Sequence, residues 1–175
     1  MMRDLAFFRP SEELTLRLLN EGLNTPREGL HGTVLRFFVR GRRQPAVIRA
    51  LSCLDTEPFE VEVTGVESYG LNGGQCFGLT LTRPQALMDL HTRMAESIRD
   101  LEFQPGYFDS IMRRYGGEAY CPHITIHYGS YIPELRHHYE GMIISVDKYY
   151  LVSRHPEGRN WFPVSSFKLG APVLI

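Results

Sequence analysis

A four-residue pattern of histidine, any residue, threonine and then an apolar residue occurs twice in this chain of 175 residues. The copies are HGTV at residues 31–34 and HITI at residues 123–126, each in a run of β-branched and apolar residues. Because successive side chains of a strand point to opposite faces, the histidine and threonine of each copy share one face. With seven histidines and 43% hydrophobic residues, a random order would give roughly 0.15 copies. The double motif therefore indicates a fold that brings two distant strands into one site.

The predicted elements around each motif follow the same order, which indicates two similar halves. A long connection over residues 103–120 precedes the second motif, and we expect it to be irregular and mobile. The pattern predicts one α+β domain over residues 1–175, with approximate repeats at 1–70 and 75–175. The expected elements are a strand at 5–8, a helix capped by Ser11 and ended by Gly22, a motif strand at 30–39, a helix at 46–54, a hairpin of strands at 59–66 and 76–81, a helix from Pro84 to Leu101, the second motif strand at 122–128, a short helix at 132–139, and strands at 142–152 and 161–169.

Strand alternation also predicts which neighbours share the face of each motif. On the first strand, Leu35 and Phe37 are expected on the motif's face, and on the second strand His127 is. The second arrangement raises the question of a metal site, but it supplies two ligands where a catalytic zinc ion normally has three protein ligands and a water. We therefore expect no metal and no other cofactor, and we interpret His127 as a neighbour of the site.

Composition narrows the class of partner. The formal net charge is -1 and the sequence pI is near 6.7, without the basic excess of proteins that bind long duplex nucleic acid. A nucleotide, a cyclic oligonucleotide or an RNA end is compatible with this charge. Three cysteines without a C-x-x-C pair favour a reducing compartment. The sequence contains no uninterrupted run of about 18 apolar residues, the length that would predict a membrane span. We expect a cytoplasmic monomer that binds no membrane.

Two histidines and two threonines on neighbouring strands suit the cleavage of a phosphodiester. One group must take a proton from the attacking oxygen and another must give one to the leaving oxygen, and histidine does either near pH 7. Hydroxyl groups can donate hydrogen bonds to the non-bridging oxygens, where charge develops in the transition state. The sequence leaves open which histidine is the acid. The predicted catalytic residues are His31, Thr33, His123 and Thr125.

At these residues the chain resembles the two-histidine phosphoesterase superfamily, which includes the RNA 2′,5′-ligase-like proteins and the 2′,3′-cyclic nucleotide phosphodiesterases. The likeness covers nearly the whole chain: LAFFRPSEEL at the start, HGTV, the stretch from Gly65 to Tyr69, a long helix, and PHITI. It implies a bilobal α+β fold with antiparallel-rich sheets around a central cleft and helices on the outside. It also implies that the four motif residues open a cyclic phosphate, or cleave a 2′,5′ linkage, without a metal. Two departures are the missing proline before the first motif and Gly32 within it, which would make that strand less rigid.

Three further residues are weaker candidates for binding the substrate. Tyr69 and Trp161 would stack on a nucleobase and Arg154 would meet a phosphate, although ordinary packing and a solvated loop explain the same residues. The leading hypothesis is a phosphodiesterase that hydrolyses a 2′,3′-cyclic phosphate or a small cyclic or 2′,5′-linked oligonucleotide. The alternatives are a nucleotide- or RNA-binding module without activity, and a reversible 2′,5′ RNA ligase.

Overall fold

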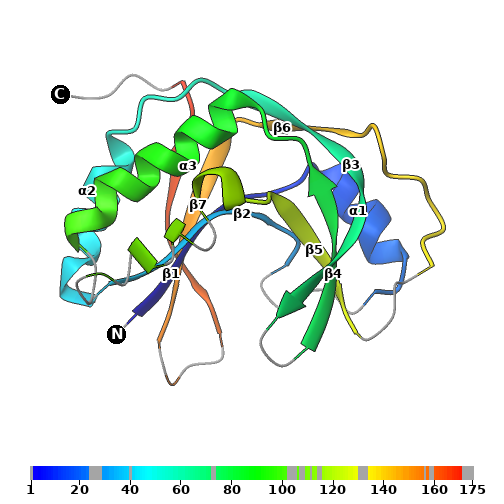
Figure 1. Cartoon of the computed structure of the whole chain (residues 1–175), viewed down its shortest axis with the longest axis horizontal. Coiled ribbons are helices and arrows are strands. Elements are labelled where there is room, and N and C mark those ends of the chain that lie inside the picture. Colours follow the sequence, from blue (N-terminus) through cyan, green and yellow to red (C-terminus); the bar gives the residue numbers. More distant parts are fainter. Residues whose placement is uncertain are drawn as a thin grey trace.

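A computed structural model describes residues 2–23, 29–39, 41–71, 74–101, 106, 109–110, 112–113, 116–129, 134–155, 157 and 160–170. Within these residues the chain forms a curled antiparallel sheet of eight strands, with helices packed against it (Figure 1). The predicted α+β class is confirmed. The strands are β1 (Met2–Phe8), β2 (Gly32–Val39), β3 (Phe59–Leu71), β4 (Gly74–Leu81), β5 (His123–Tyr128), β6 (Ile143–Val146), β7 (Lys148–Arg154) and β8 (Phe162–Lys168), and the α-helices are α1 (Glu12–Asn20), α2 (Gln44–Ser52) and α3 (Gln85–Ile98).

The strand order is β6-β3-β4-β5-β2-β1-β7-β8, so the two motif strands, β2 and β5, lie in the middle of the sheet. These two strands meet at one residue pair, Gly32 and Ile124, whereas the other neighbouring strands pair over longer stretches. The sheet therefore has two halves, which we call the β2 half (β2, β1, β7, β8) and the β5 half (β5, β4, β3, β6). Strands from both ends of the chain contribute to the β2 half, and the division of the sequence into two repeats stays a prediction.

The single strand predicted over residues 142–152 is wrong. The segment forms two strands, β6 and β7, separated by Asp147. β6 pairs with β3 at the outer edge of the β5 half, whereas β7 pairs with β1 in the β2 half. The chain therefore crosses from one half to the other at Asp147. Both strands bury alternate residues, such as Ile144 and Tyr149, so apolar alternation alone does not reveal the crossing.

Local sequence explains where the helices begin and end. α1 starts after Ser11, whose side chain accepts a hydrogen bond from the Leu14 backbone N–H at 3.2 Å. Gly22 follows α1 with φ of +71°, a left-handed conformation that a glycine adopts without strain. α2 has Pro45 in its first turn, where the missing backbone N–H costs no helical hydrogen bond.

Two predicted segments fall partly outside the described residues. Of the short helix predicted over 132–139, the described residues 134–139 form no helix, so that prediction is wrong for them. Eight residues of the connection predicted over 103–120, namely 103–105, 107–108, 111 and 114–115, lie outside the described residues, and its described end forms a 3-10 turn, Gly117–Ala119.

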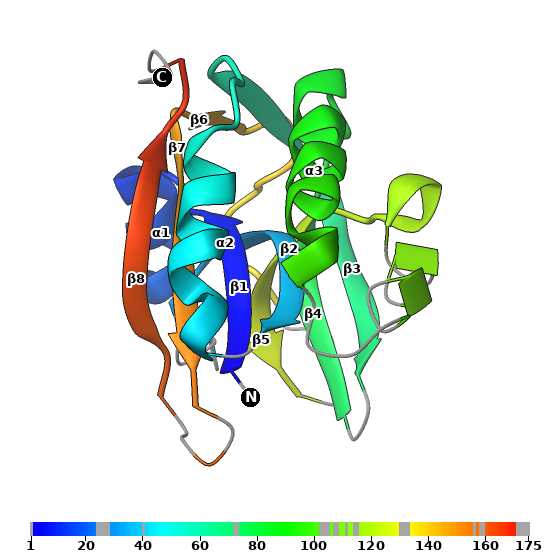
Figure 2. The same cartoon turned by 90° about the vertical axis from the view of Figure 1, so that its left-hand side faces the viewer.

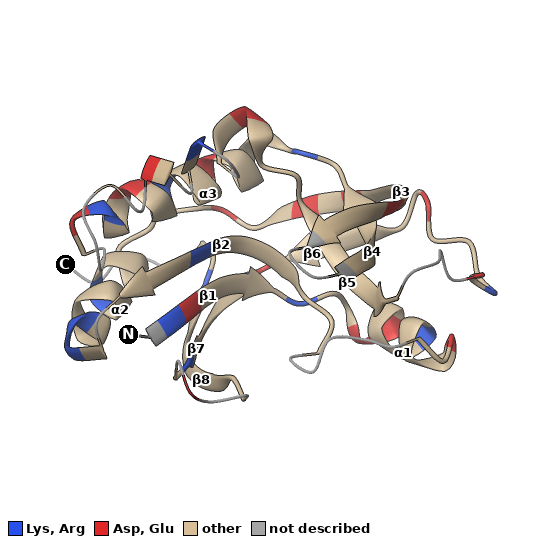
Figure 3. Cartoon of the chain, turned by 60° about the horizontal axis from the view of Figure 1, so that its bottom comes forward, with Lys and Arg blue, Asp and Glu red and all other residues tan. Residues whose placement is uncertain are grey.

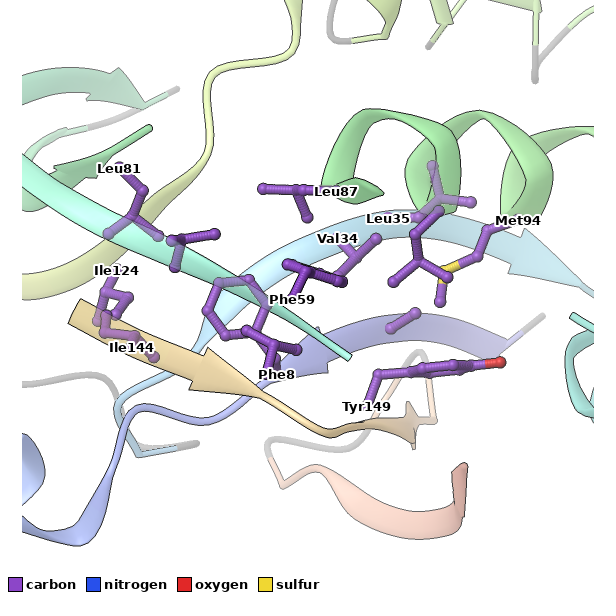
Figure 4. Close-up of a cluster of buried hydrophobic side chains, with 14 of the residues drawn as sticks. Phe8, Val34, Leu35, Phe59, Leu81, Leu87, Met94, Ile124, Ile144 and Tyr149 are labelled. Atoms are coloured by element: carbon purple, nitrogen blue, oxygen red, sulfur yellow. The ribbon is translucent and has the colours of Figure 1, made fainter. Parts of the chain in front are cut away.

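One hydrophobic cluster lies on the face of the sheet that α2 and α3 cover (Figure 2). Helix α3 buries residues spaced by three and four, as its apolar pattern predicts. Two of them, Leu87 and Met94, lie beside Val34 and Leu35 of β2 in the cluster shown in Figure 4. Phe8 of β1 joins the same cluster. The helices therefore cover one face of the sheet, and the site must lie on the other.

Candidate active site

The two motifs lie side by side at the centre of the sheet. Gly32 and Ile124 pair in antiparallel orientation, which sets the histidine of each motif toward the threonine of the other. Ile124 is fully buried, and a Cβ at Gly32 would overlap the Phe8 ring, so both middle residues face the core. The glycine of the first motif thus serves the close packing of β1 against β2. The side chains that point to the opposite face, which we call the motif face, are those of His31, Thr33, His123 and Thr125.

Each motif strand contains a β-bulge directly after its threonine. In β2 the pairing with β1 skips Val34, between Thr33 and Leu35. Val34 and Leu35 are both buried in the core, so Leu35 lies on the face opposite Thr33. The expectation that Leu35 and Phe37 share the motif face is therefore wrong. Strand alternation assumes that every residue pairs in the ladder. The extra residue, Val34, moves the residues that follow it to the opposite face.

The second bulge determines where His127 lies. The pairing of β5 with β4 joins Thr125 to Gly78 and His127 to Phe77, and skips Ile126. Gly78 and Phe77 are consecutive, so they and their partners lie on opposite faces. The His127 ring lies 6.3 Å from the Phe77 ring, between centroids. The expected position of His127 on the motif face is wrong, and its interpretation as a neighbour of the site agrees with this position.

Both motif histidines are anchored in the same way. Nδ1 of His31 lies 2.8 Å from the Gly29 carbonyl oxygen, and Nδ1 of His123 lies 2.9 Å from the Cys121 carbonyl oxygen. A carbonyl oxygen only accepts hydrogen bonds, so Nδ1 of each ring carries the proton and donates it. Nε2 is then the basic nitrogen of each neutral imidazole, and the two rings share one tautomer.

An aromatic ring lies against each imidazole. The Phe7 ring lies 5.1 Å from the His31 ring, and Tyr69 stacks on His123 with centroids 4.1 Å apart at 17°. Tyr69 comes from β3 and reaches His123 across Gly78 of β4. A Cβ at Gly78 would lie 3.1 Å from Cε2 of Tyr69 and 3.3 Å from Cδ2 of His123, so the glycine makes room for the stack. Tyr69, predicted as a substrate-binding residue, thus lies beside the motifs with one ring face against the imidazole.

The surroundings of His123 keep its imidazole neutral. Burial lowers the pKa of His123, the hydrogen bond to the Cys121 carbonyl opposes this effect, and the positive charge of Arg36 adds to it. Burial also raises the pKa of the Cys76 thiol, which lies next to Thr125. His123 therefore has an unprotonated Nε2 at neutral pH, as a proton acceptor requires.

Sequence patterns did not single out two buried residues that hold the first bulge. His91 of α3 donates from Nδ1 to the Val34 carbonyl at 2.7 Å, and the Tyr120 hydroxyl donates to the Thr33 carbonyl at 2.8 Å. Their rings stack with centroids 4.2 Å apart at 6°, and burial lowers the pKa of His91. The pair fixes the backbone on both sides of the bulge behind Thr33. The available signal was a histidine within the apolar stripe of α3.

The other two predicted binding residues lie together in the β2 half. The Arg154 guanidinium lies over the Trp161 ring, 5.3 Å from its centroid. Arg154 pairs with Arg3 across β7 and β1, whereas Phe7, beside the first motif, lies at the other end of β1. The structure therefore brings Arg154 and Trp161 together with each other, at a distance along the strands from the motifs.

A cavity of about 440 Å³ adjoins the first motif. Its lining includes Gly29, whose carbonyl anchors His31, and Tyr150, which stacks on Phe7. Arg9, another lining residue, lies over the Tyr150 ring at 5.0 Å. Throughout the described part of the chain, no group of three or more His, Cys, Asp and Glu side chains is arranged to hold a metal ion.

Comparison with protein families decides the identity of this fold. The model of the 2′-5′ RNA ligase superfamily matches residues 7–138, a span that contains both motifs. The chain belongs to the 2′-5′ RNA ligase superfamily. The resemblance to two-histidine phosphoesterases noted in the sequence is thereby confirmed at the level of the superfamily, which is one of enzymes. No curated protein sequence matches the chain.

Solved structures of this superfamily share the fold. TT0787 of Thermus thermophilus is 18% identical with a TM-score of 0.69, and the match covers 95% of this chain and 97% of that one. LigT of E. coli complexed with phosphate is 14% identical with a TM-score of 0.64, covering 96% and 97%. LigT of E. coli complexed with 3′-AMP is 14% identical with a TM-score of 0.64, and the match covers 97% of this chain and 98% of that one. Among the described residues, no helix has the length and apolar character to cross a membrane.

Proposed function

We propose that this member of the 2′-5′ RNA ligase superfamily is a metal-independent phosphodiesterase that opens a 2′,3′-cyclic phosphate, or cleaves a small cyclic or 2′,5′-linked oligonucleotide. The observation that carries the proposal is the pairing of Gly32 with Ile124, which sets two histidines with identical Nδ1 anchors on one face. The fold likeness to LigT, which was crystallised with phosphate and with 3′-AMP, supports the same class of ligand.

In this mechanism His123 is the general base and His31 the general acid. His123 takes the base role because burial and Arg36 lower its pKa, which keeps Nε2 unprotonated at neutral pH. As a water oxygen bonds to phosphorus, its proton passes to Nε2 of His123. The bond from phosphorus to the leaving ribose oxygen breaks, and Nε2 of a protonated His31 gives that oxygen its proton. Proton transfer between the two imidazoles through solvent restores the starting state.

The threonines serve the non-bridging phosphate oxygens. Thr33 and Thr125 follow their histidines by two residues on the motif face, so each hydroxyl points the same way as its imidazole. A hydroxyl that donates to a phosphate oxygen stabilises the charge that develops there as the attacking oxygen approaches. Because the strands run antiparallel, each threonine lies toward the histidine of the other motif, and the phosphate is held from both sides.

The test is turnover of a 2′,3′-cyclic nucleotide in excess chelator by the wild type, His31→Ala, His123→Ala and His127→Ala. The two motif variants should lose at least about a hundredfold in kcat, since each removes one proton-transfer group. His127→Ala is the matched control on the same strand, facing the Phe77 ring, and should keep near wild-type activity. Full activity in His123→Ala, or loss of wild-type activity with chelator, would refute the mechanism.

The superfamily match also favours a second activity at the same site, the joining of two RNA ends by a 2′,5′ bond. In this reaction the 5′-hydroxyl of a second RNA, in place of water, attacks the phosphorus of the 2′,3′-cyclic phosphate, and the bond from phosphorus to the 3′-oxygen breaks as the 2′,5′ linkage forms. Incubation of an RNA with a 2′,3′-cyclic phosphate and an excess of a 5′-hydroxyl RNA separates the two by product length. A longer product supports ligation, an opened phosphate supports hydrolysis, and tight binding without either supports the non-catalytic alternative.

A further inference from the structure

Three arginines lie on the motif face of the β2 half, one on each of three neighbouring strands. Arg36 of β2 pairs with Leu5, and Arg3 of β1 pairs with Arg154 of β7. The residues next to them along the strands, such as Phe37 and Asp4, are buried on the opposite side of the sheet. Among the described residues, no carboxylate forms an ion pair with any of the three arginines. We call this set the arginine row.

The β5 half has the opposite charge on the same face. Glu67 of β3 pairs with Gly78, the partner of Thr125, and therefore lies on the motif face. Glu60 and Glu62 alternate with buried residues of β3 and also point away from the core. Figure 3 shows the acidic segments along β3 and basic segments on β1 and β2. An extended anion therefore meets attraction on the β2 side of the motifs and repulsion on the β5 side.

The arginine row is poorly compensated within the protein. Two like charges directly opposite each other on neighbouring strands, such as Arg3 and Arg154, destabilise a sheet. Nε of Arg154 is buried and has no hydrogen-bond partner among the described residues. Arg3 lies over the Phe38 ring at 5.6 Å and Arg154 over the Trp161 ring at 5.3 Å, contacts that fix each guanidinium by one face. The planar edges with their N–H groups then suit the oxygens of phosphates.

The row leads away from the proposed catalytic centre. Arg36 is close enough to His123 for its charge to lower the imidazole pKa. Arg3 is four residues from Phe7, the residue beside His31, which corresponds to about 13 Å along β1. A single nucleotide whose phosphate lies between the histidines does not extend along the whole row, whereas a chain of nucleotides does.

We propose that the arginine row binds the backbone phosphates of a short single-stranded oligonucleotide whose reacting phosphodiester lies between the two motifs. The inference rests on the proposed function and names its substrate: an oligonucleotide that runs over β2, β1 and β7, and not an isolated cyclic mononucleotide. The row supplies binding along the chain, and the motifs supply the chemistry.

The first experiment measures binding without turnover. Its probe is a fluorescent 2′-O-methyl trinucleotide with a 3′-phosphate, which lacks the 2′-hydroxyl needed for cyclisation. The double variant Arg3→Gln, Arg154→Gln should bind this probe at least tenfold more weakly in fluorescence anisotropy. Loss of two phosphate contacts should also reduce the slope of log affinity against log salt by about 1.4. The matched control, Arg42→Gln with Arg49→Gln, removes the same charge from exposed positions outside the sheet and should bind like the wild type.

The second experiment compares turnover of a cyclic mononucleotide and of a trinucleotide that ends in the same cyclic phosphate. The wild type should prefer the trinucleotide in kcat/KM by at least tenfold. The double variant should lose that preference, and the control Arg42→Gln with Arg49→Gln should keep it. Near-UV circular dichroism of each variant verifies folding, and Arg3→Lys with Arg154→Lys separates charge from the planar fork. Equal trinucleotide binding by the double variant and the control would overturn the arginine row. Absence of turnover in the wild type would refute the proposed function alone, because probe binding still tests the row.

Discussion

At the scale of single residues, His123 has neighbours that set both its charge and its position. Arg36 acts on the charge of the imidazole, and the Tyr69 ring, admitted by Gly78, acts on its orientation. The Cys121 carbonyl fixes the tautomer. Each of these neighbours can be changed without touching the imidazole itself, and each change has a different kinetic consequence.

Arg36→Gln should move the acidic limb of the pH–rate profile to higher pH. A general base must be unprotonated, so this limb reports the pKa of His123. The positive charge of Arg36 lowers that pKa, and its removal makes protonation easier and raises the pKa. Activity on a cyclic mononucleotide should therefore fall more at pH 5.5 than at pH 7.5. An acidic limb that stays in place, or moves to lower pH, would contradict the base role of His123.

Gly78→Ala should reduce kcat by about tenfold with little loss of stability, because small misplacements of a catalytic group are costly to rate. The added Cβ would lie 3.0 Å from the Ile124 carbonyl oxygen and close to both Tyr69 and His123. Gly70→Ala on the adjoining strand is the control, because no atom lies within 4 Å of its added Cβ. If kcat is the same in both variants, the Tyr69 stack is unimportant for the imidazole.

At the scale of elements, the bulge in β2 links α3 to the motif. Without it, the strand would turn Leu35 outward or Thr33 inward, since one extra residue exchanges the two faces. The His91 and Tyr120 side chains satisfy the carbonyls on this irregular backbone, and both are buried. A helix on the core side thus determines the conformation of a residue on the other side of the sheet.

Tyr120→Phe should lower both stability and kcat. It removes the hydroxyl that donates to the Thr33 carbonyl at 2.8 Å, which costs about 1–2 kcal/mol of unfolding free energy. Tyr149→Phe is the matched control, because its buried hydroxyl donates to the Leu51 carbonyl at 2.7 Å, away from the motifs. Urea unfolding should show similar losses for both variants, and kinetics should show a lower kcat for Tyr120→Phe alone. Equal kcat values would show that Tyr120 is structural only.

At the scale of the whole molecule, the elements were more predictable than their arrangement. Alternation, capping and apolar spacing located nearly every strand and helix, because those signals are local. The faces around Thr33 and His127 were mispredicted, because a bulge depends on how a strand pairs and leaves no mark on its own sequence. The crossing at Asp147 and the role of Tyr120 depend on contacts between distant segments. For the same reason the arginine row appears only once β2, β1 and β7 are placed side by side.

The pH dependence of the unfolding free energy should depend on Asp4. Its side chain is buried on the core face of β1 and accepts a hydrogen bond from the Ser153 hydroxyl. Burial raises its pKa from 3.8 to about 6, so the folded protein disfavours the ionised form. The destabilisation by the buried Asp4 carboxylate is absent below the pKa that Asp4 has in the unfolded chain, because the group is then protonated in both states. It is complete above about pH 6, where the group is ionised in both states. Asp4→Asn should therefore raise the unfolding free energy at pH 7.5 by up to about 3 kcal/mol and change it little at pH 4. Urea titrations at both pH values test this, and a less stable variant at pH 7.5 would contradict it.

The joint between the two halves of the sheet has a mechanical consequence. Along the line where β2 meets β5, one residue pair connects two well-paired sheets, and the motif histidines stand on either side of it. The separation between the two imidazoles is thus the distance in the sheet that is held by the fewest backbone pairings. A phosphate bound by both motifs would add a second connection between the β2 half and the β5 half. In the proposed reaction, the bound substrate therefore helps to hold the β2 half and the β5 half together. Release of the product removes this connection.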